Sequence, residues 1–134
     1  AVSLNLMIGQ RLVGLLCSSC KAKEKAASSI EKVIKKTLSE IPNDISRKYQ
    51  EPYEIYHAPG CDKCKNRGIV GRVALYEVLQ MTSALEEIIN TGPTAVRIAK
   101  EARDQGVTTL RQDGMVKALE GLVSVEEVIR ETEE

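Results

Sequence analysis

The chain has 134 residues, of which 43% are hydrophobic and 28% are charged, and its 19 Lys and Arg balance its 19 Asp and Glu. Zero net charge argues against an overall basic field that would attract nucleic acid, and no apolar run reaches the roughly 18 to 20 residues of a membrane-spanning helix. Aromatic residues make up only 3%, with no Phe and no Trp. The length predicts one domain, or a core domain with a small metal-held subdomain, and the composition predicts an aliphatic core.

The first third of the chain predicts helices. Residues 4–16 carry apolar side chains at mostly helical spacing, which indicates a buried helix, or one that passes into a strand. Ser28 and Glu31 form a capping-box pattern, and the apolar series after them predicts a helix that ends before Pro42. The polar stretch 42–52 predicts a loop.

The middle of the chain predicts strands. Residues 53–58 alternate in the manner of a short strand, and residues 69–79 are rich in β-branched side chains. Gly71 interrupts the second run and indicates a bulge or a close approach. We expect a strand pair around the second cysteine motif.

The last third predicts four short helices, at about residues 83–90, 94–105, 109–120 and 124–132. Three of them open on capping-box patterns, Ser83-x-x-Glu86, Thr109-x-x-Gln112 and Ser124-x-x-Glu127. Gly92, Gly106 and Gly121 are predicted to stop helices or form turns.

All four cysteines lie in two C-x-x-C pairs, Cys17/Cys20 and Cys61/Cys64, with 40 residues between the pairs. Four thiolates fill a structural zinc site and leave no open position for water or substrate. We expect no secretory signal, and the reduced thiols then expected would favour metal over two disulfides. A thioredoxin-like redox pair needs a βαβ pattern, which the predicted elements lack. We therefore predict these four cysteines as Zn²⁺ ligands.

The residues beside the cysteines suit such a site. We call the tight turn around each C-x-x-C pair a knuckle, the first at Cys17/Cys20 and the second at Cys61/Cys64. Gly60 and Gly68 supply the backbone freedom that the second knuckle needs. Lys21, Lys63 and Lys65 can offset the double negative charge of a tetrathiolate zinc centre. We expect them to support the metal rather than to react.

Catalytic motifs are missing from the sequence. It contains no G-x-x-x-x-G-K-[ST] phosphate loop, no G-x-G-x-x-G and no H-E-x-x-H. The single histidine, His57, is expected to be a partly exposed strand residue rather than a ligand or a base. We therefore predict no catalytic residue in this chain.

Several short sequence motifs indicate a protein family more specifically than the overall composition does. They are Gly9-Gln10-Arg11-Leu12-Val13, Leu16-Cys17-x-x-Cys20-Lys21, Gly60-Cys61-x-x-Cys64-x-x-x-Gly68, Gly71-Arg72-Val73-Ala74-Leu75-Tyr76-Glu77-Val78-Leu79, Gly106-x-x-Thr109-Leu110-x-x-Asp113-Gly114-x-x-Lys117-x-x-x-x-Gly121 and Ser124-x-Glu126-Glu127-Val128. In this order the chain resembles, over about residues 8–130, the C-terminal part of the assembly ATPases of type II secretion and type IV pilus systems.

The resemblance implies an α+β, mostly helical fold in three parts. Residues 1–16 would end a RecA-like core, residues 17–68 would form a zinc-binding subdomain, and residues 69–134 would form a return strand and a C-terminal helical bundle. The Walker motifs of the family precede the part that this chain resembles. We therefore expect this chain alone to be inactive and to have a structural and partner-docking role.

The resemblance also implies a parent protein. It would be a cytoplasmic hexameric motor, peripheral to the inner membrane, that binds ATP and Mg²⁺. Its partners would be neighbouring ATPase subunits and inner-membrane platform proteins, with no nucleic acid. Departures such as Gly14, where the family usually has Arg, leave the choice among secretion, pilus and DNA-uptake subfamilies open.

The alternative is a free-standing zinc module that binds nucleic acid. Lysines flank each knuckle, and Arg67 and Arg72 lie nearby. Zero net charge and the lack of aromatic residues placed for base stacking argue against it.

Overall fold

The computed structural model describes residues 3–133, so residues 1 and 2 of the predicted core segment and residue 134 of the predicted bundle lie outside it. The elements are β1 (Leu6–Leu16), β2 (Ala22–Lys25), α1 (Ser28–Ser39), α2 (Asn43–Ser46), β3 (Glu54–His57), the 3₁₀ turn η1 (Asp62–Cys64), β4 (Ile69–Gln80), α3 (Ser83–Thr91), α4 (Ala95–Asp104), α5 (Leu110–Leu119) and α6 (Val125–Thr132). The fold is α+β, as predicted. Within the described residues no helix has the length and apolar character of a membrane span.

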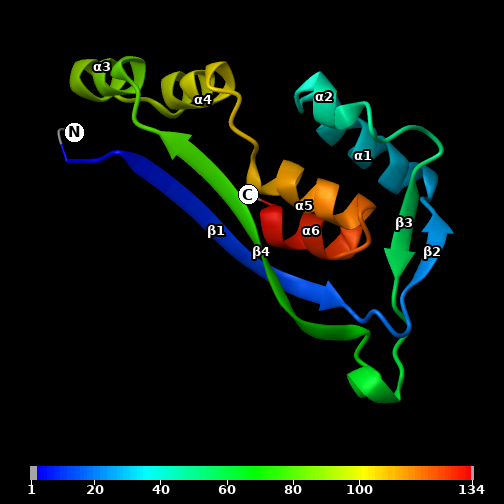
Figure 1. The fold of residues 1–134 in the computed structure, drawn as a ribbon. Helices are drawn as coiled ribbons and strands as arrows, with labels where there is room; N and C mark the ends of the chain where they lie inside the picture. Colours follow the sequence, from blue (N-terminus) through cyan, green and yellow to red (C-terminus); the bar gives the residue numbers. More distant parts are fainter. Residues whose placement is uncertain (1–2, 134) are drawn as a thin grey trace.

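A long two-stranded ribbon of β1 and β4 runs through the molecule (Figure 1). The helix predicted over residues 4–16 is therefore wrong, because this segment pairs antiparallel with β4 from Leu6–Gln80 to Leu16–Ile69. Its residues 8–12 are all exposed, and Ile8 keeps 58% of its surface open to solvent. The register shifts between Gly14 and Leu16, opposite the predicted bulge at Gly71, whose φ is +77°.

The segment between the cysteine pairs folds into a second hairpin and a helix. β3 forms as predicted but pairs with β2, and β4 pairs with β1, so the expected strand pair around the second cysteine motif is wrong. Helix α1 also forms as predicted. Its N-cap is Ala27 without a side-chain hydrogen bond, so the Ser28–Glu31 capping box does not occur. The predicted loop contains the one-turn helix α2.

The four C-terminal helices begin and end within one residue of their predicted bounds. The Thr109–Gln112 capping box forms with both of its hydrogen bonds. Ser124 caps α6, but the Glu127 carboxylate accepts from the Gly14 N–H at 2.8 Å instead of closing a box. The N-cap of α3 is Thr82 and not the predicted Ser83. Helix α3 pairs with α4 at one end of the ribbon, and α5 pairs with α6 against its middle (Figure 1).

One aliphatic core joins these parts. Ile34 and Ile55, from the segment between the cysteine pairs, are buried with Leu75 of β4 and with Met115 and Val128 of the α5–α6 pair. The predicted boundaries at residues 16/17 and 68/69 stay a prediction, because a shared core sets no boundary by itself.

The crossing of α5 with α6 generates a first prediction. A Cβ added at Gly114 would lie 2.6 Å from Val128 Cγ1 and 3.0 Å from Leu75 Cδ1. Both neighbours are fully buried, so Gly114→Ala should lower the free energy of unfolding by about 1–3 kcal/mol, as overpacking does. Denaturant unfolding of the variant measures the change.

Gly9→Ala is the matched control, because its Cβ would meet Glu77 Cβ at an ordinary 3.6 Å. Equal stability of Gly114→Ala and the wild type would contradict the close packing of α5 on α6.

Candidate metal centre

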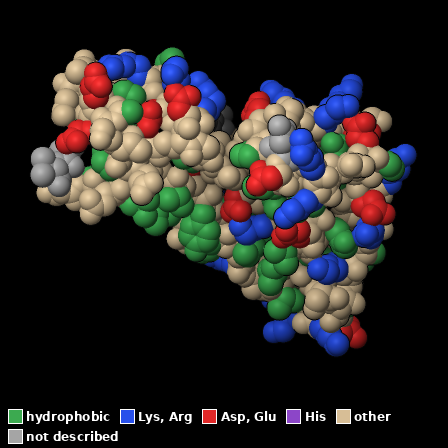
Figure 2. Space-filling model, turned by 45° about the horizontal axis from the view of Figure 1, so that its top comes forward, with side chains coloured by type: hydrophobic (Ala, Val, Ile, Leu, Met, Phe, Trp, Pro, Cys, Tyr) green, Lys and Arg blue, Asp and Glu red, His purple; other side chains and the backbone are tan. Residues whose placement is uncertain are grey.

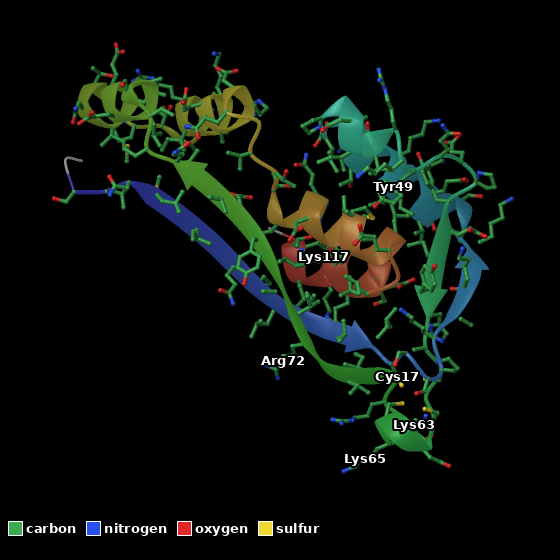
Figure 3. The ribbon with its side chains drawn as sticks, viewed as in Figure 1. Cys17, Tyr49, Lys63, Lys65, Arg72 and Lys117 are labelled. Atoms are coloured by element: carbon green, nitrogen blue, oxygen red, sulfur yellow. The ribbon has the colours of Figure 1, made fainter. Side chains whose placement is uncertain are left out.

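The two C-x-x-C pairs meet at the end of the ribbon, where Figure 3 shows Cys17 close to the knuckle that carries Lys63 and Lys65. The ribbon's pairing continues past Leu16, since the Cys17 N–H donates to the Gly68 carbonyl at 2.8 Å. This hydrogen bond places the first pair directly beside the second. The 40 residues between the pairs leave through β2 and return through β3.

All four sulfurs converge on one point. Their Sγ atoms lie within 4.8 Å of one another, and the four cysteines are free thiols. The Cys17–Cys61 and Cys20–Cys64 sulfur separations are 3.9 Å, and the Cys61–Cys64 separation is 3.7 Å. A tetrahedral zinc ion with Zn–S bonds of about 2.3 Å holds its sulfurs about 3.8 Å apart. The spacing therefore fits zinc.

Backbone amides surround the sulfur of Cys64. The N–H groups of Cys61 and Gly68 donate to its Sγ at 3.1 and 3.2 Å. Burial opposes ionisation of this thiol, yet the two amides and the neighbouring thiols hold its pKa at about 6. The Ser19 amide likewise lowers the pKa of Cys17. Two of the four sulfurs are thus prepared for the thiolate form that a metal binds.

Cys20 has the opposite environment. Burial raises the pKa of its thiol to about 12, so this sulfur stays protonated without a cation nearby. A divalent cation held by the four sulfurs would stabilise the Cys20 thiolate, and the thiol proton would be released to water. The donor set therefore fits a cation better than it fits four neutral thiols.

The backbone of the second knuckle is shaped for this arrangement. Gly60 and Gly68 adopt φ values of +110° and +70°, which confirms the conformational freedom predicted for them. Lys65 and Asn66 also adopt left-handed conformations, with φ of 54° and 59°. These turns aim successive amides at the cysteines, with the Asn66 N–H on the Cys61 carbonyl at 2.9 Å.

The remaining predicted residues fall into two groups. His57 is exposed on β3, as expected for a strand residue, and the group of four cysteines does not include it. Lys63 and Lys65 are exposed beside the second knuckle, whereas the ammonium of Lys21 donates to the Gly121 carbonyl at 2.7 Å. No sequence pattern predicts this contact, and its only local signal is the lysine directly after Cys20.

Comparisons with known proteins show the family of the chain. The family described as "Type II/IV secretion system protein" matches residues 1–130. The chain is 39% identical over its whole length to the type IV pilus assembly ATPase PilB of Pseudomonas aeruginosa. It is 34% identical over 97% of its length to the protein of that name from Myxococcus xanthus, and 33% identical over 96% to the type II secretion system ATPase E of Vibrio cholerae. It spans only 22%, 22% and 23% of these relatives.

The close approach at Gly68 generates a second prediction. A Cβ at this position would lie 2.2 Å from the Ala58 carbonyl oxygen, on a backbone with φ of +70°. Gly68→Ala should therefore displace the amide that donates to Cys64. Loss of such an outer partner lowers metal affinity about 10- to 100-fold, and a chelator competition measures the change for zinc.

Gly71→Ala is the control for backbone strain without a steric clash. Gly71 has a similar φ of +77° and nothing within 4 Å of its Cβ position. The same loss of zinc affinity in both variants would contradict the role given to Gly68.

Proposed function

The chain belongs to the family of type II/IV secretion system proteins, and on that premise we propose that it is the zinc-clamped C-terminal part of a motor ATPase that drives type II secretion or type IV pilus assembly. The observation that carries the proposal is the convergence of Cys17, Cys20, Cys61 and Cys64 at zinc spacing. The printed names of the similar proteins supply the kind of motor.

The metal in this proposal is structural Zn²⁺. Four thiolates are soft ligands that suit zinc, and they fill its tetrahedral coordination. Cys17 and Cys64 are buried, which keeps water from their sulfurs. Such a site supplies shape and no chemistry. The sequence contains no G-x-x-x-x-G-K-[ST] phosphate loop. ATP and Mg²⁺ would therefore bind other parts of the parent protein, and this chain alone would be inactive as an ATPase.

The ribbon supports the proposal that residues 1–16 end a RecA-like core. Leu6, Ile8 and Leu12 of β1 face the same side as Tyr76 and Val78 of β4, because these positions alternate along paired strands. All five are exposed by between 44% and 58%. An apolar face of this kind marks an interaction surface, and the rest of the motor would cover it.

The knuckle supports a docking role. Lys63, Lys65 and Arg67 are exposed around it, and Lys and Arg side chains gather at this tip in the space-filling view (Figure 2). Arg72 is exposed further along the ribbon (Figure 3). Zinc would hold this surface in shape for a neighbouring subunit of the hexamer or for a platform protein of the inner membrane. The motor would then work in the cytoplasm, at the membrane surface.

A metal analysis tests the proposal. The purified protein should contain about one zinc per chain, because four thiolates complete one tetrahedral site. Cys61→Ser removes one ligand, so its zinc content should fall far below one. Amide hydrogen exchange should then rise in residues 17–21 and 58–68 and stay unchanged in α3 and α4, which lie at the opposite end of the ribbon.

Asp62→Asn is the control, since Asp62 is exposed beside Cys61 and is not a member of the cysteine cluster. A wild-type protein that is fully folded without metal would overturn the structural role of zinc.

A salt titration tests the nucleic-acid alternative. The tetrathiolate centre carries two negative charges beside the knuckle cations, and Tyr56 is covered by Lys21 and Lys23 at 5.5 and 5.8 Å from its ring centroid. We therefore expect only weak binding of single- or double-stranded DNA or RNA near physiological salt. Tight binding that weakens steeply as salt rises would favour the free-standing zinc module.

A further inference from the structure

Helix α5 ends in a turn that presents two carbonyls to the first knuckle. Gly121 adopts a φ of +77°, and its N–H donates to the Ala118 carbonyl at 3.0 Å. The Leu122 N–H donates to the Lys117 carbonyl at 2.9 Å. This is a Schellman motif, and it leaves the carbonyls of Gly121 and Leu122 free to accept hydrogen bonds from elsewhere.

The first knuckle donates to both of these carbonyls. The Leu16 N–H, just before Cys17, donates to Leu122 at 2.8 Å. The Lys21 ammonium, just after Cys20, donates to Gly121 at 2.7 Å. The Lys21 N–H closes the knuckle on the Cys17 carbonyl at 2.9 Å. Both ends of the metal-binding turn are therefore tied to the end of α5.

The groups around the Lys21 ammonium stabilise its positive charge. Its ammonium lies 5.5 Å from the centroid of the Tyr56 ring, within the range of a cation–π contact. It also lies at the C-terminus of α5, the negative end of the helix dipole. The same ring would lie 2.9–3.0 Å from a Cβ at Gly121, so only glycine lets Tyr56 and Lys21 reach the turn together.

We propose that Lys21 is a positioning residue that couples zinc binding at the first knuckle to the docking of the α5–α6 pair, through the Gly121 carbonyl. This inference rests on the proposed zinc site. Zinc orders the turn from Cys17 to Cys20, and the ordered turn places Lys21 on α5. By reciprocity, the docked helix end favours the knuckle conformation that binds zinc.

Zinc affinity and melting temperature of Lys21→Met test the coupling. Such couplings change an affinity about 5- to 150-fold, and we expect this variant to bind zinc about tenfold more weakly in a chelator competition. Its melting temperature should fall in the zinc-loaded protein and not in the metal-stripped protein, where the knuckle no longer positions the side chain. Lys21→Arg keeps the donor and should restore most of the affinity.

Lys23→Met is the matched control, because Lys23 also lies over Tyr56 but pairs with Glu54 at 2.9 Å on the exposed hairpin. It should leave zinc affinity unchanged. Removing zinc from the wild-type protein should in addition raise hydrogen exchange at the Leu16 and Leu122 amides.

The outcomes separate the two proposals. A wild-type protein that binds no zinc overturns the proposed function and this inference with it. Zinc binding that Lys21→Met leaves unchanged overturns the coupling alone, and so does an equal loss of melting temperature with and without zinc. If Lys21→Met does not fold, the wild-type exchange experiment decides, because unchanged exchange at Leu16 and Leu122 after zinc removal overturns the coupling.

Discussion

The antiparallel pairing of β1 with β4 is the constraint on which the metal centre depends. The pairing runs from Leu6–Gln80 to Leu16–Ile69 and continues in the hydrogen bond from Cys17 to Gly68. Two cysteine motifs that are 40 residues apart in sequence therefore meet where the ribbon ends. A slip of one residue would turn each side chain to the opposite face. The bulge near Gly71 thus belongs to the geometry that sets the cysteine positions.

The apolar core and the cysteine cluster hold different parts of the segment between the motifs. Ile34 of α1 and Ile55 of β3 pack with Met115 of α5 in the main core. The knuckles carry few apolar side chains of their own, and their order comes from amides on sulfur, such as Gly68 on Cys64. The helix and hairpin are therefore held by the core, whereas the knuckles are held by hydrogen bonds to their sulfurs and, in the proposed function, by zinc.

The sequence predicts those features that depend on residues close together in the chain. The cap at Thr109, the strand from Ile69 and the four cysteines all follow from spacings of three residues or from runs of β-branched residues. Residues 4–16 were predicted wrongly because both faces of β1 are apolar: Val13 is buried on one face and Ile8 is exposed on the other. The alternation of apolar and polar residues that usually marks a strand is therefore absent from this segment. Contacts such as Lys21 with Gly121 join residues 100 positions apart, and no local pattern encodes them.

Helix α5 is held at both ends, and this decides which parts of the fold can move together. At its N-terminus the Leu110 N–H donates to the Glu77 carboxylate at 3.1 Å, and Asp113 accepts from the Tyr76 N–H at 2.9 Å. At its C-terminus it meets the knuckle through Lys21. A displacement of β4 would therefore carry α5 and the cysteine cluster as one body. Any force that moves the ribbon would thus move the exposed knuckle surface with it.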